Sequence, residues 1–132
     1  MLAGCQSTPN SPPGDPDPAA WQASTLSEQT IARANEAVKV YERCLNTEAL
    51  ASVRHRGDPR VVADQVLRAC EQHLEGIRTA YSAEGVPDAV SERYMRKTRS
   101  RGAQSLMRFV QAVEAQRAAE EAETQAMQNR KN

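Results

Sequence analysis

The sequence predicts an all-α fold, in which an antiparallel helical hairpin and a long third helix pack into one small bundle. Apolar residues recur at spacings of three and four along three stretches of the chain, as on one face of an α-helix. Glycine and proline separate these stretches, and no alternation typical of a strand is present. The 132 residues correspond to one small domain. The 17 basic and 17 acidic residues balance, so overall charge favours no class of partner.

The segment that precedes the helices is expected to stay unpacked. Residues 6–24 contain five prolines together with serine, asparagine and aspartate, and almost no aliphatic side chains. This composition is typical of a linker with polyproline II character. We therefore predict a disordered, proline-rich tether over 6–24, which would reach about 60 Å when fully extended.

The first helix is predicted to begin near Thr25 and to end at Gly57. In the run Thr25-Leu26-Ser27-Glu28, the threonine hydroxyl and the glutamate carboxylate fit a capping box, in which each satisfies a free backbone N–H. A glycine in the position of Gly57 is typical of a helix C-terminus. The expected inward face consists of Ile31, Ala34, Val38, Tyr41 and Leu45, and it continues through Leu50 and Val53.

The second helix is predicted to run from Asp58 to Gly85. Asp58 is a good N-cap, and Pro59 is tolerated in the first turn, where no backbone hydrogen bond is lost. Gly85 again fits a helix end. The expected inward face consists of Val62, Val66, Ala69, Cys70, His73, Ile77 and Tyr81.

The third helix is predicted to start after Val86-Pro87-Asp88. A polar run over 96–102 interrupts its apolar face, and the folded helical domain is expected to cover 25–114. Residues 115–132 are rich in alanine, glutamate and glutamine, which predicts a solvated helical tail that packs on nothing. The expected inward residues are Val90, Tyr94, Leu106, Phe109, Val110 and Val113.

The spacing of two cysteines predicts a disulfide bond between the first two helices. Cys44 and Cys70 each lie thirteen residues from Gly57, so an antiparallel hairpin that turns there sets them at the same level. Both lie on the inward faces, and a disulfide needs Cα atoms about 4.4–6.8 Å apart. The alternative is a pair of buried free thiols. The same mirror argument sets Gly102 near the level of Cys70, where a small residue would leave room for the sulfur atoms.

Residues Leu2-Ala3-Gly4-Cys5 resemble the lipobox of bacterial lipoproteins. The resemblance covers residues 1–5 and implies that signal peptidase cuts before Cys5, which then carries lipid and anchors the protein to a membrane. In that family an aspartate after the cysteine favours the inner membrane, so Gln6 implies the periplasmic face of the outer membrane. The family also has a basic and an apolar segment upstream. Only Met1 precedes the motif here, so either that leader lies upstream or Cys5 carries no lipid.

A basic segment in the third helix is the first candidate for partner binding on the folded domain. Such segments bind acidic proteins, anionic lipids or nucleic acid. Apart from Tyr94 it lacks the interleaved aromatic residues that stack on bases, and its charges are expected to point in several directions around the helix. The candidate residues are Arg93, Arg96, Lys97, Arg99, Arg101 and Arg108.

Neither catalysis nor a metal site is predicted. The chain has two histidines, no glycine-rich phosphate loop and no hydrolase or metalloprotease motif. Cys70 and His73 have metal-ligand spacing, but Cys44 and His55 would lie about 16 Å apart along one helix and could not share one ion with them. We predict a non-enzymatic protein without a cofactor.

Three functional hypotheses remain. The first is a lipid-anchored periplasmic module that binds or scaffolds another envelope protein. The second is a secretin-pilotin-like assembly factor, because pilotins resemble this chain in being small, helical, disulfide-containing lipoproteins that hold a secretin subunit in a groove. The third, which predicts free thiols, is a cytosolic helical protein that binds nucleic acid through residues 93–108.

Overall fold

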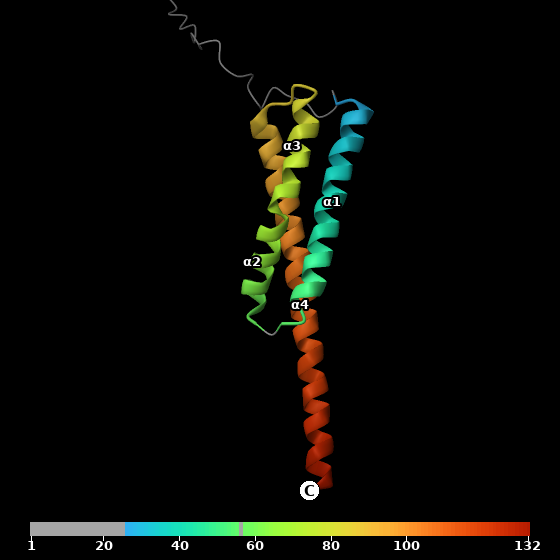
Figure 1. Ribbon diagram of the computed structural model, residues 1–132, viewed down its shortest axis with the longest axis vertical. Helices are drawn as coiled ribbons and strands as arrows, with labels where there is room; N and C mark the ends of the chain where they lie inside the picture. Colours follow the sequence, from blue (N-terminus) through green and yellow to red (C-terminus); the bar gives the residue numbers. More distant parts are fainter. Residues whose placement is uncertain (1–25, 56) are drawn as a thin grey trace, which may run out of the picture.

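The computed structural model describes residues 26–55 and 57–132, which form a bundle of three helical rods (Figure 1). The prediction of an all-α fold is confirmed, since the described residues contain no strand. The first and third rods run in the same direction, and the second runs antiparallel to both (Figure 1). In chain order the elements are α1 (Glu28–Ser52), α2 (Pro59–Cys70), the 3-10 helix η3 (Glu71–Leu74), α3 (Glu75–Ser82) and α4 (Asp88–Lys131). The first rod is α1, the second consists of α2, η3 and α3, and the third is α4.

Helix α1 begins later than predicted and uses a different capping partner. Ser27 is the N-cap, and its Oγ accepts a hydrogen bond from the backbone N–H of Thr30 at 3.2 Å. The backbone N–H of Ser27 donates to Glu84 Oε1 at 2.8 Å. A carboxylate from the end of the second rod thus has the role predicted for Glu28. Thr25 lies outside the described residues.

Helix α1 ends at Ser52, five residues before Gly57, so the predicted C-terminus is wrong. Val53 is the C-cap, and its carbonyl oxygen accepts a hydrogen bond from the guanidinium of Arg117 in α4. A cation at this end of a helix also interacts favourably with the helix dipole. The helix therefore ends where a side chain distant in sequence satisfies a carbonyl that has no partner within the helix.

The second rod is broken rather than continuous. Its start is as predicted, with the Asp58 side chain accepting from the backbone N–H of Arg60 at 2.8 Å and Pro59 in the first turn. The 3-10 turn η3 then interrupts the rod directly after Cys70, the residue that is bonded to α1. Short 3-10 segments within a helix commonly mark local strain.

The turn from α3 to α4 confirms the role predicted for Gly85. Gly85 has a φ of 75°, the left-handed conformation that glycine adopts most easily. The backbone N–H of Val86 donates to the carbonyl of Tyr81, and that of Gly85 donates to the carbonyl of Ser82, both at 3.1 Å. These two bonds make a Schellman motif, and Val86 is buried beside it.

The core runs along the axis where the three rods meet, and most of the predicted inward residues lie in it. Ile31 and Ala69 are exposed, in contrast to the prediction, and Leu50 and Phe109 are also exposed. Three small polar residues, Thr30, Ser91 and Thr98, are buried instead. Thr98 lies within the polar run over 96–102 and packs inward, so α4 keeps one packed face through that run.

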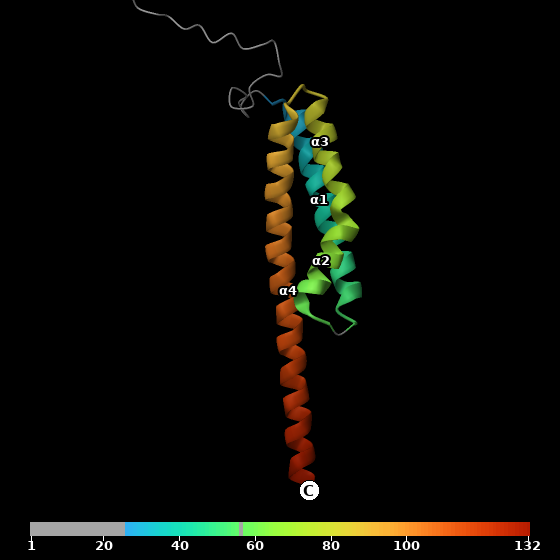
Figure 2. The same cartoon turned by 90° about the vertical axis from the view of Figure 1, so that its left-hand side faces the viewer.

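Helix α4 is about 66 Å long at 1.5 Å per residue and extends well beyond the other rods (Figure 2). Residues 118–132 are exposed, as predicted for a solvated tail. The expectation that nothing after 114 packs needs one correction, because half-buried Arg117 contacts the end of α1. The C-terminus lies at the opposite end of the molecule from the start of α1 (Figure 1).

Candidate functional site

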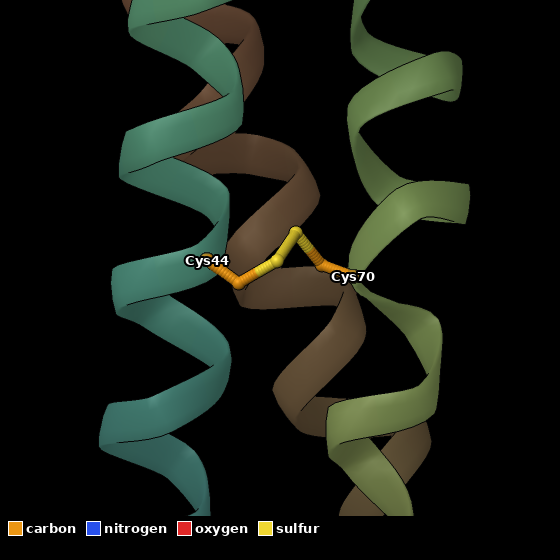
Figure 3. The surroundings of a disulfide bond; sticks show 2 residues. All are labelled: Cys44 and Cys70. Atoms are coloured by element: carbon orange, nitrogen blue, oxygen red, sulfur yellow. A yellow bond between two sulfur atoms is a disulfide. The ribbon is translucent and has the colours of Figure 1, made fainter.

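The predicted disulfide bond between Cys44 and Cys70 is present (Figure 3). Their Cα atoms are 5.8 Å apart, within the range expected from the hairpin register, and the bond closes a loop with a sequence separation of 26. Cys70 is fully buried, whereas Cys44 is half-buried. The bond joins the middle of α1 to the junction of α2 and η3, so it fixes the position of the second rod at its break.

Gly102 is packed closely, but not against the sulfur atoms. A Cβ atom at this position would lie 2.8 Å from Leu45 Cδ1 and 3.2 Å from Tyr41 Cε1. The small residue therefore makes room for the first helix itself, and the prediction that it accommodates the disulfide is wrong. Its effect is to bring the backbone of α4 against the ring of Tyr41 in the floor of a groove.

This groove lies between α1 and α4, the two rods that touch each other least, and has a volume of about 900 Å³. On α1 the lining residues span Asn35 to Leu50, and on α4 they span Tyr94 to Phe109. Each wall is therefore about 22 Å long, or four helical turns. The floor and walls are mainly apolar, through Val38, Tyr41, Leu45, Ala49, Leu50, Tyr94, Gly102, Leu106 and Phe109.

Two large apolar side chains are exposed at the end of the groove nearer the tail. Leu50 is 61% exposed and Phe109 is 37% exposed. Sequence periodicity assigned both to the core, because it identifies an apolar face without showing whether a neighbouring helix covers it. The signal that was missed is the pair of small residues Gly102 and Ser105, three positions apart on one face of α4, which both line the groove.

Two buried hydroxyl groups also belong to groove-lining residues. The hydroxyls of Tyr41 and Thr98 form no hydrogen bond within the described part of the chain. Burial raises the pKa of Tyr41, an effect that Arg99 partly opposes and Glu71 reinforces. The phenol therefore stays protonated at neutral pH and remains a hydrogen-bond donor. A buried polar group without a partner costs about 1–3 kcal/mol.

Four of the six predicted basic residues lie on one side of α4. Arg93, Lys97, Arg101 and Arg108 follow one another at steps of four, four and seven residues, which keeps them on one helix face. All four are exposed, and none forms an ion pair with a described residue. We call this set the basic stripe. The expectation that the charges point in several directions is thus wrong for these four.

The other two basic residues lie elsewhere on α4. Arg99 points to the second rod, where its Nε lies 3.0 Å from Glu71 Oε2. This ion pair is half-exposed and is a surface link between α4 and η3. Arg96 is exposed and lies one turn from Arg93, on the side of the stripe that faces away from the groove. The structure therefore divides the predicted segment into a stripe of four, one cross-link and one solvated side chain.

The basic stripe borders the groove along its α4 side. Its members each precede a groove-lining residue by one position, and Arg101 itself lines the groove. The residues that follow those lining positions, such as Arg99 and Val110, instead face the second rod or the core. The opposite edge, on α1, carries Asn35, Glu42 and Asn46. The groove thus has one strongly basic edge and one edge without net charge, where exposed Lys39, three residues before Glu42 on the same helix face, balances that carboxylate.

The other features considered in the sequence are the lipidation cysteine, the tether, a metal site and a membrane-spanning helix. Cys5 and the tether over 6–24 lie outside the described residues. Within 26–55 and 57–132, no group of three or more histidine, cysteine or acidic side chains is arranged to hold a metal ion. In the same ranges, no helix combines the length and apolar character needed to cross a bilayer. Comparisons with protein-family models, curated proteins and solved structures find no match for this chain.

Proposed function

We propose that this chain is a lipid-anchored binding module on the periplasmic face of a bacterial outer membrane, and that it holds a helix of another envelope protein in the groove between α1 and α4. The observation that carries the proposal is the groove itself, which is apolar along its floor for about four helical turns and open to solvent. Concave apolar surfaces with a few polar groups are the usual form of a binding site.

A helix suits this groove better than an extended peptide does. The walls are two helices whose backbone groups are already hydrogen-bonded internally, so they offer no pairing edge to an extended chain. Backbone N–H and C=O groups buried without partners are costly, and a helix satisfies its own. A docked helix would also complete a four-helix arrangement with α1 and α4 as its neighbours.

The disulfide and the N-terminal motif together support the periplasmic location. Disulfide bonds persist in oxidising compartments such as the periplasm and are rare in the cytosol. The bond between Cys44 and Cys70 therefore favours export, as does the resemblance of residues 2–5 to a lipobox. Lipid on Cys5 would tether the bundle to the membrane without a spanning helix.

The groove also favours the pilotin-like hypothesis as the specific form of this function. Pilotins hold a secretin subunit in a helical groove, and the groove of about four turns in this disulfide-linked helical domain is of that kind. The rival hypothesis of nucleic-acid binding draws only on the basic stripe. It leaves the apolar groove without a role, since a duplex offers no apolar helix to fill it.

Two measurements test the proposal. Intact mass spectrometry of protein from its native cells should show acyl chains on Cys5, lost in Cys5→Ser, and two fewer free thiols than cysteines. A photo-crosslinking amino acid at Phe109 should capture one envelope protein, whereas the same amino acid at Val61, which is 54% exposed on α2 outside the groove, should not. An unmodified Cys5 would remove the anchor. Equal capture at both positions, or recovery of nucleic acid, would remove the groove as the binding site.

A further inference from the structure

The geometry points to an amphipathic helix with an acidic flank as the occupant of the groove, bound so that its acidic flank lies along the basic stripe of Arg93, Lys97, Arg101 and Arg108. This inference rests on the proposed function and adds the chemistry of the partner. It also fixes how the occupant is rotated about its own axis, because only one of its two flanks would meet the cations.

The length of the groove sets the length of the occupant. Both walls span fifteen residue steps, from Asn35 to Leu50 and from Tyr94 to Phe109, which corresponds to about 22 Å. A helix of about fifteen residues fills that length. Its apolar side chains would recur at spacings of three and four, so that four or five of them face the floor.

The charges at the two edges differ enough to select a flank. The basic stripe places four cations along the α4 edge, over the same turns that line the groove, and none of them forms an ion pair within 26–55 and 57–132. The α1 edge presents Glu42 with the amides of Asn35 and Asn46. Exposed Lys39 lies on the same face, three residues before Glu42, so the charges along this edge balance. Complementary charges steer association and suppress wrong partners. An occupant with carboxylates beside α4 and neutral residues beside α1 matches both edges.

An anionic membrane surface would fit the stripe but not the groove. The stripe alone offers cations to lipid head groups, yet a nearly flat bilayer cannot fill a channel about four helical turns long between two helices. A second copy of this chain fits less well, because its exposed tail over 118–132 has Met127 as its only large apolar side chain. A partner helix with a leucine-like apolar face and an acidic flank accounts for both the groove and the basic stripe.

The test uses the full chain and two labelled synthetic peptides of about eighteen residues. Both peptides carry the same leucine face, and one flank is glutamate in the first and lysine in the second. Fluorescence anisotropy at low salt should show the acidic peptide binding at least about tenfold more tightly, with the preference shrinking as salt rises. The double variant Lys97→Glu/Arg101→Glu should abolish the preference, whereas Arg130→Glu/Lys131→Glu, the same two charge reversals in the exposed tail, should retain it.

Other outcomes overturn the inference in distinguishable ways. Equal binding of both peptides, lost in Leu50→Lys but kept in Val61→Lys, would leave the helix-binding groove standing and remove the acidic partner. If neither peptide binds, the inference fails, and crosslinking at Phe109 then decides the proposed function alone. Stripe-dependent binding to vesicles containing anionic lipid, without peptide binding, would assign the stripe to a membrane. Self-association that excludes the peptides would assign the groove to a second copy.

Discussion

The carboxylate of Glu84 accepts two hydrogen bonds from Ser27, 57 residues earlier in the chain: one from the backbone N–H at 2.8 Å and one from the hydroxyl at 3.2 Å. Ser27 is the N-cap of α1, and Glu84 follows the end of α3. The contact therefore joins the start of the first rod to the end of the second, at the opposite end of the bundle from the loop that connects them. It is a capping box whose acidic member comes from another helix.

We expect this contact to make stability depend on pH in the acidic range. Hydrogen bonds from Thr30 and Ser27 hold the pKa of Glu84 below its usual 4.5. Because the folded-state pKa is the lower one, the stabilisation is fully present above pH 4.5 and is lost as pH falls through the folded value. Glu84→Gln should lower the melting temperature at pH 7, and its difference from wild type should narrow below pH 4.5. Glu123→Gln, in the exposed tail, is the control; a difference independent of pH would contradict the assignment.

Removal of the disulfide bond is expected to cause a large loss of stability. Constraining the unfolded chain by a loop of this size contributes about 3–4 kcal/mol on the chain-entropy model. For a domain of this size that corresponds to a fall of about 10–25 °C in melting temperature. Thermal unfolding of Cys44→Ala/Cys70→Ala, or of wild type in reducing agent, measures the effect. Cys5→Ser should melt like wild type, and equal melting with and without reductant would show that the bond contributes nothing.

The size of the side chain at position 102 should decide how closely α4 packs on α1. Gly102→Leu places several atoms where Leu45 and the ring of Tyr41 already lie, and we expect it to cost about 1–3 kcal/mol. Gly102→Ala adds only the Cβ, whose nearest neighbour is the end of the flexible Leu45 side chain. The gain of about 1 kcal/mol in helix propensity offsets the cost of that close contact. The alanine variant should therefore leave the free energy of unfolding nearly unchanged. Urea unfolding of both variants gives the comparison, and a neutral leucine variant would contradict it.

Local signals predicted those features that neighbouring residues in the chain determine. Asp58 and Pro59 start a helix, Gly85 ends one, and the equal distances of Cys44 and Cys70 from the turn give the hairpin register. Each depends on capping, backbone conformation or helical rise, which are properties of short segments. Gly57 misled the prediction, because a helix end can also be set by a distant partner such as Arg117.

The groove could not be predicted because periodicity shows which face of a helix is apolar but not what covers it. Leu106 and Phe109 lie three residues apart on one face of α4, yet Leu106 is in the core and Phe109 is 37% exposed. The difference comes from the separation of α1 and α4, which depends on long-range packing around Gly102. The basic stripe was hidden for another reason: Arg96 and Arg99 belong to the same sequence segment but point elsewhere.

The contact between Arg117 and Val53 should hold the last turn of α1 in place. The guanidinium donates to the Val53 carbonyl and also lies 3.2 Å from Glu114. Arg117→Ala should lower the free energy of unfolding by about 0.5–1.5 kcal/mol and speed amide hydrogen exchange at the end of α1. Arg130→Ala, a cation in the exposed tail, should change neither quantity. Faster exchange in both variants would show that the contact has no local effect.

Two leucines five residues apart on α1 should separate binding from stability. Leu45 is buried against Gly102 and also lines the groove, so Leu45→Ala should cost about 2–5 kcal/mol and weaken binding as well. Leu50 is mostly exposed, so Leu50→Lys should change the free energy of unfolding by less than about 0.5 kcal/mol. The variant nevertheless introduces a charge at the end of the apolar groove. It should therefore weaken binding of the acidic-flanked peptide at least about tenfold. Urea unfolding and anisotropy on the same samples measure both quantities. A Leu50→Lys variant that stays folded and binds like wild type would show that this end of the groove contacts no partner.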